Sequence, residues 1–148
     1  MNIFAHLALG LIIGKLTGNY PAAILGSIAI DIDHFIVFFK YKVFKNIKKT
    51  IAFFVEEKDP YNGQRGYLHN VFALALISLI LWLINSSFGL IFFLAYAGHL
   101  FFDAIDTADF YPFYTRKVNI RGFIGYFSKI EWEITATLFV IYAILFFL

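Results

Sequence analysis

The chain has 148 residues, of which 61% are hydrophobic and only 15% are charged, and its mean hydropathy is +0.76. Because a soluble domain of this size carries about 25% charged residues, this composition predicts a membrane protein, with one domain over residues 1–148. The formal net charge of only +2 does not suggest a nucleic-acid-binding surface. The chain has no cysteine, which excludes disulfides and thiolate metal sites.

The apolar segments predict an all-α integral membrane bundle of about five transmembrane helices. The expected helices cover residues 3–16, 21–39, 67–84, 88–106 and 131–148. The first segment does not resemble a cleavable signal peptide, because it lacks a basic start and carries His6 inside its apolar run. Within residues 40–66, the apolar stretch 51–55 is flanked by charged pairs, which predicts an amphipathic helix on the membrane surface.

Two basic loops orient the expected bundle. Residues 40–66 and 107–130 together hold eleven of the twelve lysines and arginines, whereas the turns at 17–20 and 85–87 hold none. The positive-inside rule therefore predicts that both loops face the cytoplasm. We expect a multi-pass protein of the cell membrane with a cytoplasmic N-terminus and a C-terminus on the far side.

All four histidines of the chain lie within or at the ends of the expected helices. His6 and His69 begin their helices, while His34 and His99 lie towards the ends of theirs. In an up-down bundle, odd helices start and even helices end on the same side, so all four are expected at a similar depth near the cytoplasmic face. The acidic residues that follow the same rule are Asp31, Asp33, Asp103, Asp106, Glu131 and Glu133.

Local spacing supports a shared metal site. His99 and Asp103 are four residues apart and share a helical face, whereas Asp33 points away from its neighbours unless the helix ends there. Imidazole and carboxylate ligands suit zinc, manganese, iron or nickel better than calcium, and zinc is the leading expectation. There are more candidates than one tetrahedral ion can use, so we expect one metal ion or two bridged by a carboxylate. The candidate ligands are His6, Asp31, Asp33, His34, His69, His99 and Asp103.

Other interpretations of these residues remain open. The same groups could form a proton or ion pathway, a transit site of a metal transporter, or a structural metal site without catalysis. Glu131 could act as a general base or extra ligand, or it could be an interfacial acid beside Trp132. Arg65 could bind an anionic group of a substrate, or it could only contribute to the positive-inside charge.

Four short motifs contain the candidate histidine and aspartate ligands. They are FAHLALG at 4–10, DIDH at 31–34, QRGYLHN at 64–70 and HLFFD at 99–103. With these motifs the chain resembles the YdjM-like membrane-bound metal-dependent hydrolases, described as LexA-binding and inner-membrane-associated. That family carries Pro-Asp-Ile-Asp-His, His-Arg-Gly-x-Thr-His-Ser and Gly-x-x-His-x-x-x-Asp-type motifs. The chain departs from the family at Ile30, Gln64, Leu68 and Asn70, where proline, histidine, threonine and serine are usual, so the resemblance implies a divergent member with altered substrate-side groups.

The residues and the resemblance together predict a membrane-bound metal-dependent hydrolase. A bound metal would lower the pKa of a water molecule towards neutrality. A site at headgroup depth with Arg65 nearby favours an amphiphilic phosphoester substrate, such as a phospholipid or a polyprenyl phosphate. The expected partners are therefore the lipid bilayer and such a substrate.

Overall fold

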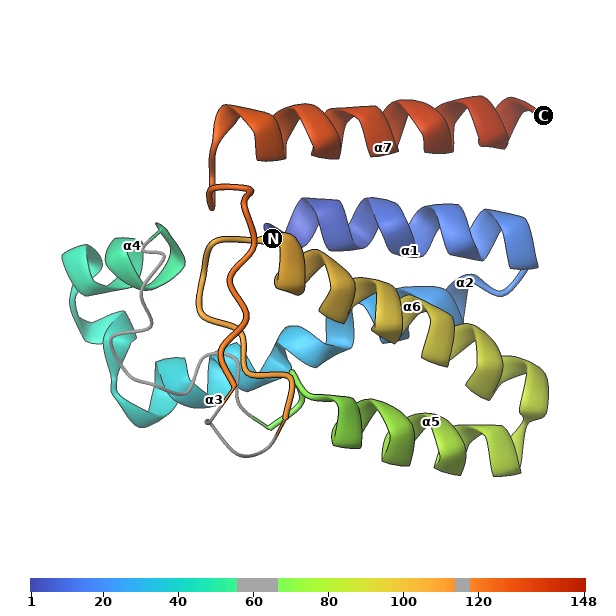
Figure 1. Ribbon diagram of the computed structural model, residues 1–148, viewed down its shortest axis with the longest axis horizontal. Helices are drawn as coiled ribbons and strands as arrows, with labels where there is room; N and C mark the ends of the chain where they lie inside the picture. The colour runs from blue at the N-terminus through green and yellow to red at the C-terminus, as the bar shows by residue number, and fades with distance from the viewer. Residues whose placement is uncertain (56–66, 114–117) are drawn as a thin grey trace.

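The computed structural model describes residues 1–55, 67–113 and 118–148, and every regular element in these ranges is helical (Figure 1). This arrangement confirms the all-α prediction. The elements are α1 (Ile3–Thr17), α2 (Tyr20–Ile28), the 3-10 turn η1 (Ala29–Asp31), α3 (Ile32–Lys40), the 3-10 turn η2 (Val43–Lys45), α4 (Ile47–Val55), α5 (Val71–Ile84), α6 (Ser86–Ile105) and α7 (Lys129–Phe147).

Three helical stretches in the described ranges are long and apolar enough to cross a membrane. They are Tyr20–Lys40, Ser86–Ile105 and Lys129–Phe147. The other two expected spans, α1 and α5, are apolar but have only 15 and 14 residues. At about 1.5 Å per residue each is about 22 Å long, which is less than the roughly 30 Å hydrocarbon core.

Helix α5 begins at Val71, four residues later than the apolar pattern predicts. The side chain of Asn70 caps it, because Asn70 Oδ1 accepts a hydrogen bond of 2.9 Å from the Ala73 backbone N–H. His69 therefore lies in the bend before the helix rather than in its first turn.

The helix expected over residues 21–39 is interrupted by η1 between α2 and α3. A 3-10 turn has three residues per turn instead of 3.6, so it changes which side chains face the bundle after the interruption. Asp33, just beyond the turn, is consequently buried and faces the bundle.

Close helix contacts hold the bundle together. Helix α2 packs against both α1 and α6, α5 packs against α6, and α7 packs against α1. A Cβ atom at Gly26 would lie 2.5 Å from the backbone oxygen of Phe92, so α2 and α6 approach each other closely at this glycine. The largest buried apolar cluster lies between α5 and α6 and includes Phe92 and Tyr96.

Helix α4 is the amphipathic helix expected within residues 40–66; the rest of that loop from residue 56 onwards lies outside the described ranges.

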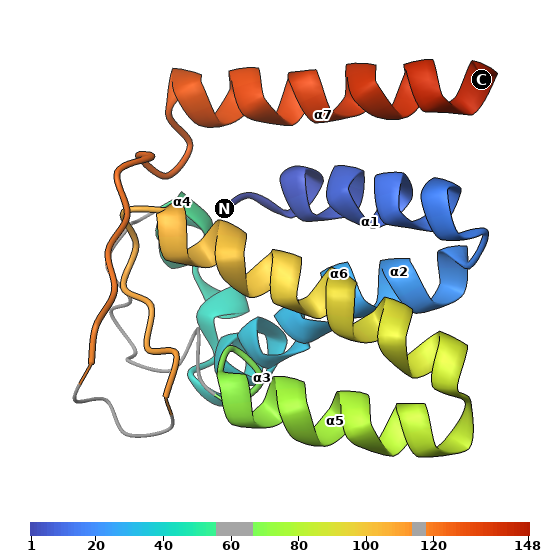
Figure 2. The same cartoon turned by 45° about the vertical axis from the view of Figure 1, so that its right-hand side comes forward.

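The two ends of the bundle differ (Figure 2). The α1–α2 and α5–α6 turns and the C-terminus lie at one end. The N-terminus, α3, α4 and the connection from α6 to α7 lie at or near the opposite end, where the candidate site forms.

Candidate metal centre

The candidate ligands gather at the end of the bundle that contains the N-terminus. They come from the start of α1, from η1 and α3, from the bend before α5, and from the last turns of α6. The buried members, each at most 1% exposed, are His6, Asp33, His69, His99 and Asp103. Asp31 and His34 retain 18% and 26% side-chain exposure, so the cluster is open on the α3 side.

Two imidazole nitrogens and two carboxylate oxygens form the centre of the cluster. His69 Nε2 lies 3.1 Å from His99 Nε2 and 3.3 Å from Asp31 Oδ1. Asp103 Oδ2 lies 3.4 Å from each of these two imidazole nitrogens. His99 Nε2 lies 3.6 Å from Asp31 Oδ1. Together they define one small cage of potential ligand atoms.

The second nitrogen of each central imidazole faces a hydrogen-bond acceptor. His69 Nδ1 lies 2.9 Å from Asp33 Oδ2, and His99 Nδ1 lies 2.7 Å from the backbone oxygen of Ser27. In the neutral form of each imidazole, which is the form that binds a metal, these acceptors favour the hydrogen on Nδ1 and leave the lone pair on Nε2. Metal-binding histidines commonly have this arrangement, in which a carboxylate or carbonyl fixes the orientation of the ring.

The spacing of the cage also suits a metal ion. Four ligands arranged tetrahedrally at about 2.0–2.1 Å from zinc are separated from one another by about 3.3–3.4 Å. The five nitrogen–nitrogen and nitrogen–oxygen separations in the cage, 3.1–3.6 Å, lie around this value. Asp31, His69 and His99 form one group of ligand atoms that could hold a divalent cation, and Asp103 belongs to another with His6 and His99.

The remaining two histidines flank the cage. The His6 ring stacks on His99 with 3.7 Å between centroids, and its Nε2 lies 3.6 Å from Asp103 Oδ1. His34 Nε2 lies 3.3 Å from Asp31 Oδ1. His6 forms a metal-capable group with His99 and Asp103, and His34 forms one with Asp33 and His69.

The protonation of His69 reflects the negative charge around it. Burial lowers its pKa, but the charge of Asp33 and the hydrogen bonds that the His69 ring donates to Asp31 and Asp33 outweigh burial and raise the pKa from 6.5 to about 10. Without a metal, the site thus holds a proton on His69 as its compensating positive charge. A metal cation would replace that proton.

Asp33 has a different place from the one its spacing alone predicts. A continuous helix would turn it away from Asp31 and His34, but η1 turns it inward. Its Oδ2 accepts hydrogen bonds from both the His69 ring and the Leu68 backbone N–H, the latter at 3.3 Å. Asp33 therefore orients His69 and the bend that carries it.

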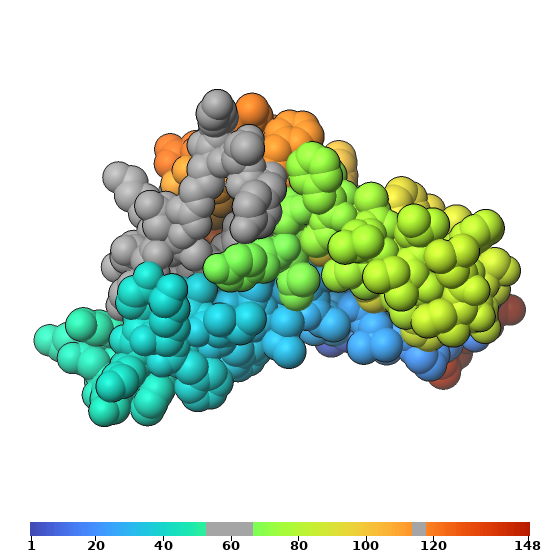
Figure 3. Space-filling model, turned by 90° about the horizontal axis from the view of Figure 1, so that it is seen from below, coloured from blue at the N-terminus to red at the C-terminus, as the bar shows by residue number. Residues whose placement is uncertain are grey.

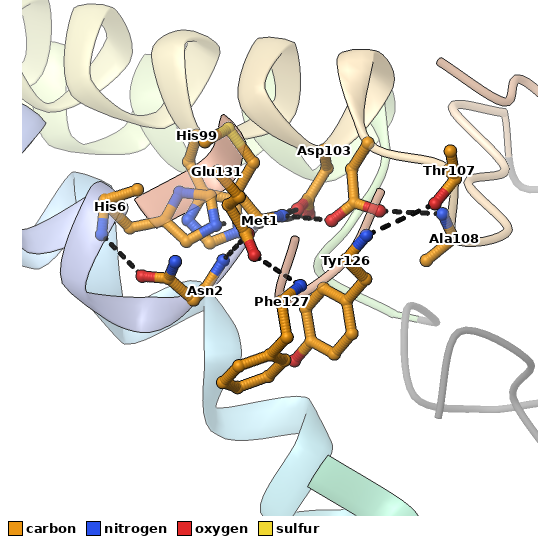
Figure 4. Close-up of polar contacts among 12 residues, drawn as sticks. Met1, Asn2, His6, His99, Asp103, Thr107, Ala108, Tyr126, Phe127 and Glu131 are labelled. Atoms are coloured by element: carbon orange, nitrogen blue, oxygen red, sulfur yellow. Dashed lines mark hydrogen bonds and ion pairs between the residues drawn. The ribbon is translucent and has the colours of Figure 1, made fainter. Parts of the chain in front are cut away.

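Some contacts in the site were not expected from the sequence. The α-amino nitrogen of Met1 lies 2.8 Å from Asp103 Oδ1 and 2.8 Å from Asp106 Oδ2 (Figure 4). The Tyr96 hydroxyl donates to the Leu68 backbone oxygen and so supports the bend before α5. Tyr96 gave no sequence signal because an aromatic residue in an apolar helix is usually packing.

Glu131 occupies a structural position. Its two carboxylate oxygens accept the backbone N–H groups of Asn2 and Phe127, each at 2.5 Å (Figure 4). It is fully buried, and the metal-capable groups of the described ranges do not include it. Glu131 thus joins the start of α7 to the segment before α1. Arg65, the other residue expected to assist catalysis, lies outside the described ranges.

The bend that carries His69 lies against α3 on the face shown in Figure 3, where residues 67–70 and α5 are green and α3 is cyan. On the open side of the cluster, the exposed neighbours of Asp31 and His34 along the chain are the apolar residues Ile32, Phe35 and Ile36, each more than half exposed. The exposed chain neighbours of these two site residues are therefore apolar.

Comparison with known proteins gives one match. No curated protein and no solved structure matches the chain. A family model described as YdjM inner membrane protein matches residues 1–148, in agreement with the resemblance seen in the motifs and with the apolar helices of a membrane protein. The chain belongs to the YdjM inner membrane protein family.

Proposed function

We propose that this protein is a membrane-embedded metal-dependent hydrolase whose metal is held by Asp31, His69, His99 and Asp103. One observation carries the proposal. The two central Nε2 atoms lie 3.1 Å apart, one carboxylate oxygen of Asp31 and one of Asp103 each lie 3.3–3.6 Å from both, and both Nδ1 atoms face acceptors. Zinc is the first choice for such a nitrogen and oxygen donor set, with manganese and iron as alternatives. Four donors are enough for one ion.

The flanking residues have supporting roles in this proposal. Asp33 holds His69 in the tautomer that presents Nε2, and the Ser27 carbonyl does the same for His99. His6 either adds a ligand or supports a second ion.

A metal bound in such a site supplies Lewis acidity and lowers the pKa of a bound water molecule towards 7. The chain must then provide a proton acceptor on the accessible side. His34 is the most exposed member of the cluster, at 26% of its side chain, and its Nε2 points towards Asp31. We therefore assign the general-base role to His34 rather than to Glu131, whose oxygens are occupied by backbone N–H groups.

The substrate that fits this setting is an amphiphilic phosphoester. The exposed chain neighbours of Asp31 and His34 are Ile32, Phe35 and Ile36, which suit an apolar tail more than a fully hydrated metabolite. Arg65 precedes His69 by four residues and would supply the positive charge for an anionic group. The distribution of lysines around this end of the bundle supports a cytoplasmic orientation of the site.

Metal analysis of the purified protein tests the proposal. Wild-type protein is expected to hold stoichiometric metal and to hydrolyse a member of a panel of phospholipids and polyprenyl phosphates. His69→Ala and Asp103→Ala should lose both properties, whereas the exposed control Glu133→Gln should keep both. Wild-type protein without stoichiometric metal would refute the site. Bound metal with no hydrolysis of the panel would favour a structural or metal-handling role instead.

A further inference from the structure

The segment from α3 to α4 carries positive charge that the metal centre does not use. Its exposed lysines are Lys40, Lys42, Lys45, Lys48 and Lys49. Within residues 1–55, 67–113 and 118–148, the ion pairs of lysine and arginine side chains involve Lys129 and Arg121 instead. Among the residues of these described ranges, no acidic side chain pairs with any of the five lysines.

The same segment exposes large apolar side chains between the lysines. At least half of the surface is accessible for Phe35, Phe39, Phe44, Ile47 and Ile51. These five residues and the five lysines are called the α3–α4 surface below.

Packing holds α3 and α4 to each other rather than covering the α3–α4 surface. Val37 of α3 and Val43 of η2 form a small buried cluster, and the Thr50 hydroxyl of α4 donates to the Val43 backbone oxygen at 3.1 Å. Helix α4 lies beyond the end of the bundle (Figure 1). Its apolar side chains Ile47 and Ile51 remain on the outside.

The placement of the lysines is not explained by helix formation. Lys48 and Lys49 lie in the first turn of α4, where Asn46 Oδ1 accepts their backbone N–H groups at 3.0 and 3.2 Å. The first turn contains no acidic residue. Because the N-terminus of a helix carries a partial positive charge, lysines there oppose helix stability unless an external anion compensates.

We propose that the α3–α4 surface binds the headgroups of anionic phospholipids. Lysines interleaved with phenylalanine and isoleucine suit a bilayer interface, where apolar side chains enter the acyl boundary and ammonium groups remain among the phosphates. Since α3 also carries Asp33 and His34, bound lipid headgroups would gather beside the open edge of the metal centre. The lipid interaction itself does not depend on hydrolysis.

Hydrogen exchange of the full-length protein in lipid nanodiscs tests this proposal. The comparison is between pure phosphatidylcholine and an equal mixture of phosphatidylcholine and phosphatidylglycerol. We expect slower amide exchange over residues 41–52 in the anionic mixture. The difference should vanish at about 1 M salt, where the Debye length falls to about 3 Å.

A triple variant, Lys45→Gln with Lys48→Gln and Lys49→Gln, should lose this difference, because glutamine keeps the helix propensity but not the charge. A lysine near an anionic surface contributes about fivefold, so three removed charges reduce the lipid-dependent protection by on the order of 100-fold. The control Lys129→Gln removes a lysine that has its own partner, Glu133, and should behave as wild type.

Equal exchange in the two lipid compositions, or a lipid effect that survives in the triple variant, would overturn the proposal. Metal content measured on the same samples keeps the two proposals separate. If the lipid effect is lost and metal is still bound, only the proposal for the α3–α4 surface fails. If metal is absent and the lipid effect remains, only the proposal for the metal centre fails.

Discussion

Replacing Asp33 by asparagine tests whether Asp33 orients His69 or binds the metal directly. The Asp33–His69 hydrogen bond is 2.9 Å long, and both side chains are buried, at 1% and 0% exposure. A charge-assisted bond of this kind contributes about 1.5–3 kcal/mol, which corresponds to about 10–100-fold in an equilibrium constant. Because asparagine keeps an acceptor oxygen but loses the charge, Asp33→Asn should weaken metal affinity by about 10–100-fold without abolishing stoichiometric binding.

Competition of the purified variant against a chelator of known affinity measures this change. Asp109→Asn is the matched control, because Asp109 pairs with Arg121 at 2.5 Å outside the cluster. Unchanged metal affinity in Asp33→Asn would refute the orienting role. Complete loss of metal would instead make Asp33 a direct ligand.

Four further predictions have defined outcomes. Since the pKa of His69 is about 10 in the metal-free protein, metal binding at neutral pH should release about one proton, and metal affinity should fall about tenfold per pH unit on acidification. Calorimetry in buffers of different ionisation enthalpy measures the released proton. Metal binding without proton release would contradict the assignment of His69 as a ligand. The same raised pKa stabilises the metal-free fold fully below pH 6.5, and this contribution is lost as pH rises through about 10. Gly26→Ala should destabilise the bundle by about 1–3 kcal/mol, because its Cβ meets a backbone oxygen of α6, whereas Gly98→Ala meets only the end of a flexible leucine and should cost less in thermal unfolding. Glu131→Gln should lose about 1–3 kcal/mol of stability and keep its metal; loss of metal would restore the predicted ligand role.

Much of the cluster follows from the sequence because depth in an up-down bundle depends only on chain direction. His6 and His69 near the starts of odd helices, and His34 and His99 towards the ends of even helices, must lie at one end whatever the detailed packing. The four-residue spacing then places His99 and Asp103 on the same helical face. Their Nε2–Oδ2 separation of 3.4 Å agrees with that spacing.

The inward position of Asp33 could not be predicted from periodicity. The apolar pattern is continuous through residues 21–39, so nothing marks the 3-10 turn at Ala29–Asp31. The carbonyl of Ser27 is equally hidden, because a backbone acceptor for His99 carries no residue-type signal. Both features depend on tertiary contacts between α2, α6 and the bend before α5.

Helix lengths were also overestimated where a side chain rather than hydropathy decides the boundary. Asn70 starts α5 by capping it, although Leu68 and Tyr67 before it are as apolar as the helix itself. The sequence offered Glu131 as a general base or an extra ligand, and it gave no sign that the backbone N–H groups of Asn2 and Phe127 donate to its two oxygens. A single sequence contains no trace of these pairings.

X-ray absorption spectroscopy of the metal-loaded protein tests the central claim most directly. We predict a first shell of nitrogen and oxygen atoms at about 2.0–2.1 Å that includes two imidazoles, as expected for His69 and His99. His99→Ala should reduce the imidazole contribution or release the metal. A shell without imidazole in wild-type protein, or no bound ion at all, would contradict the account.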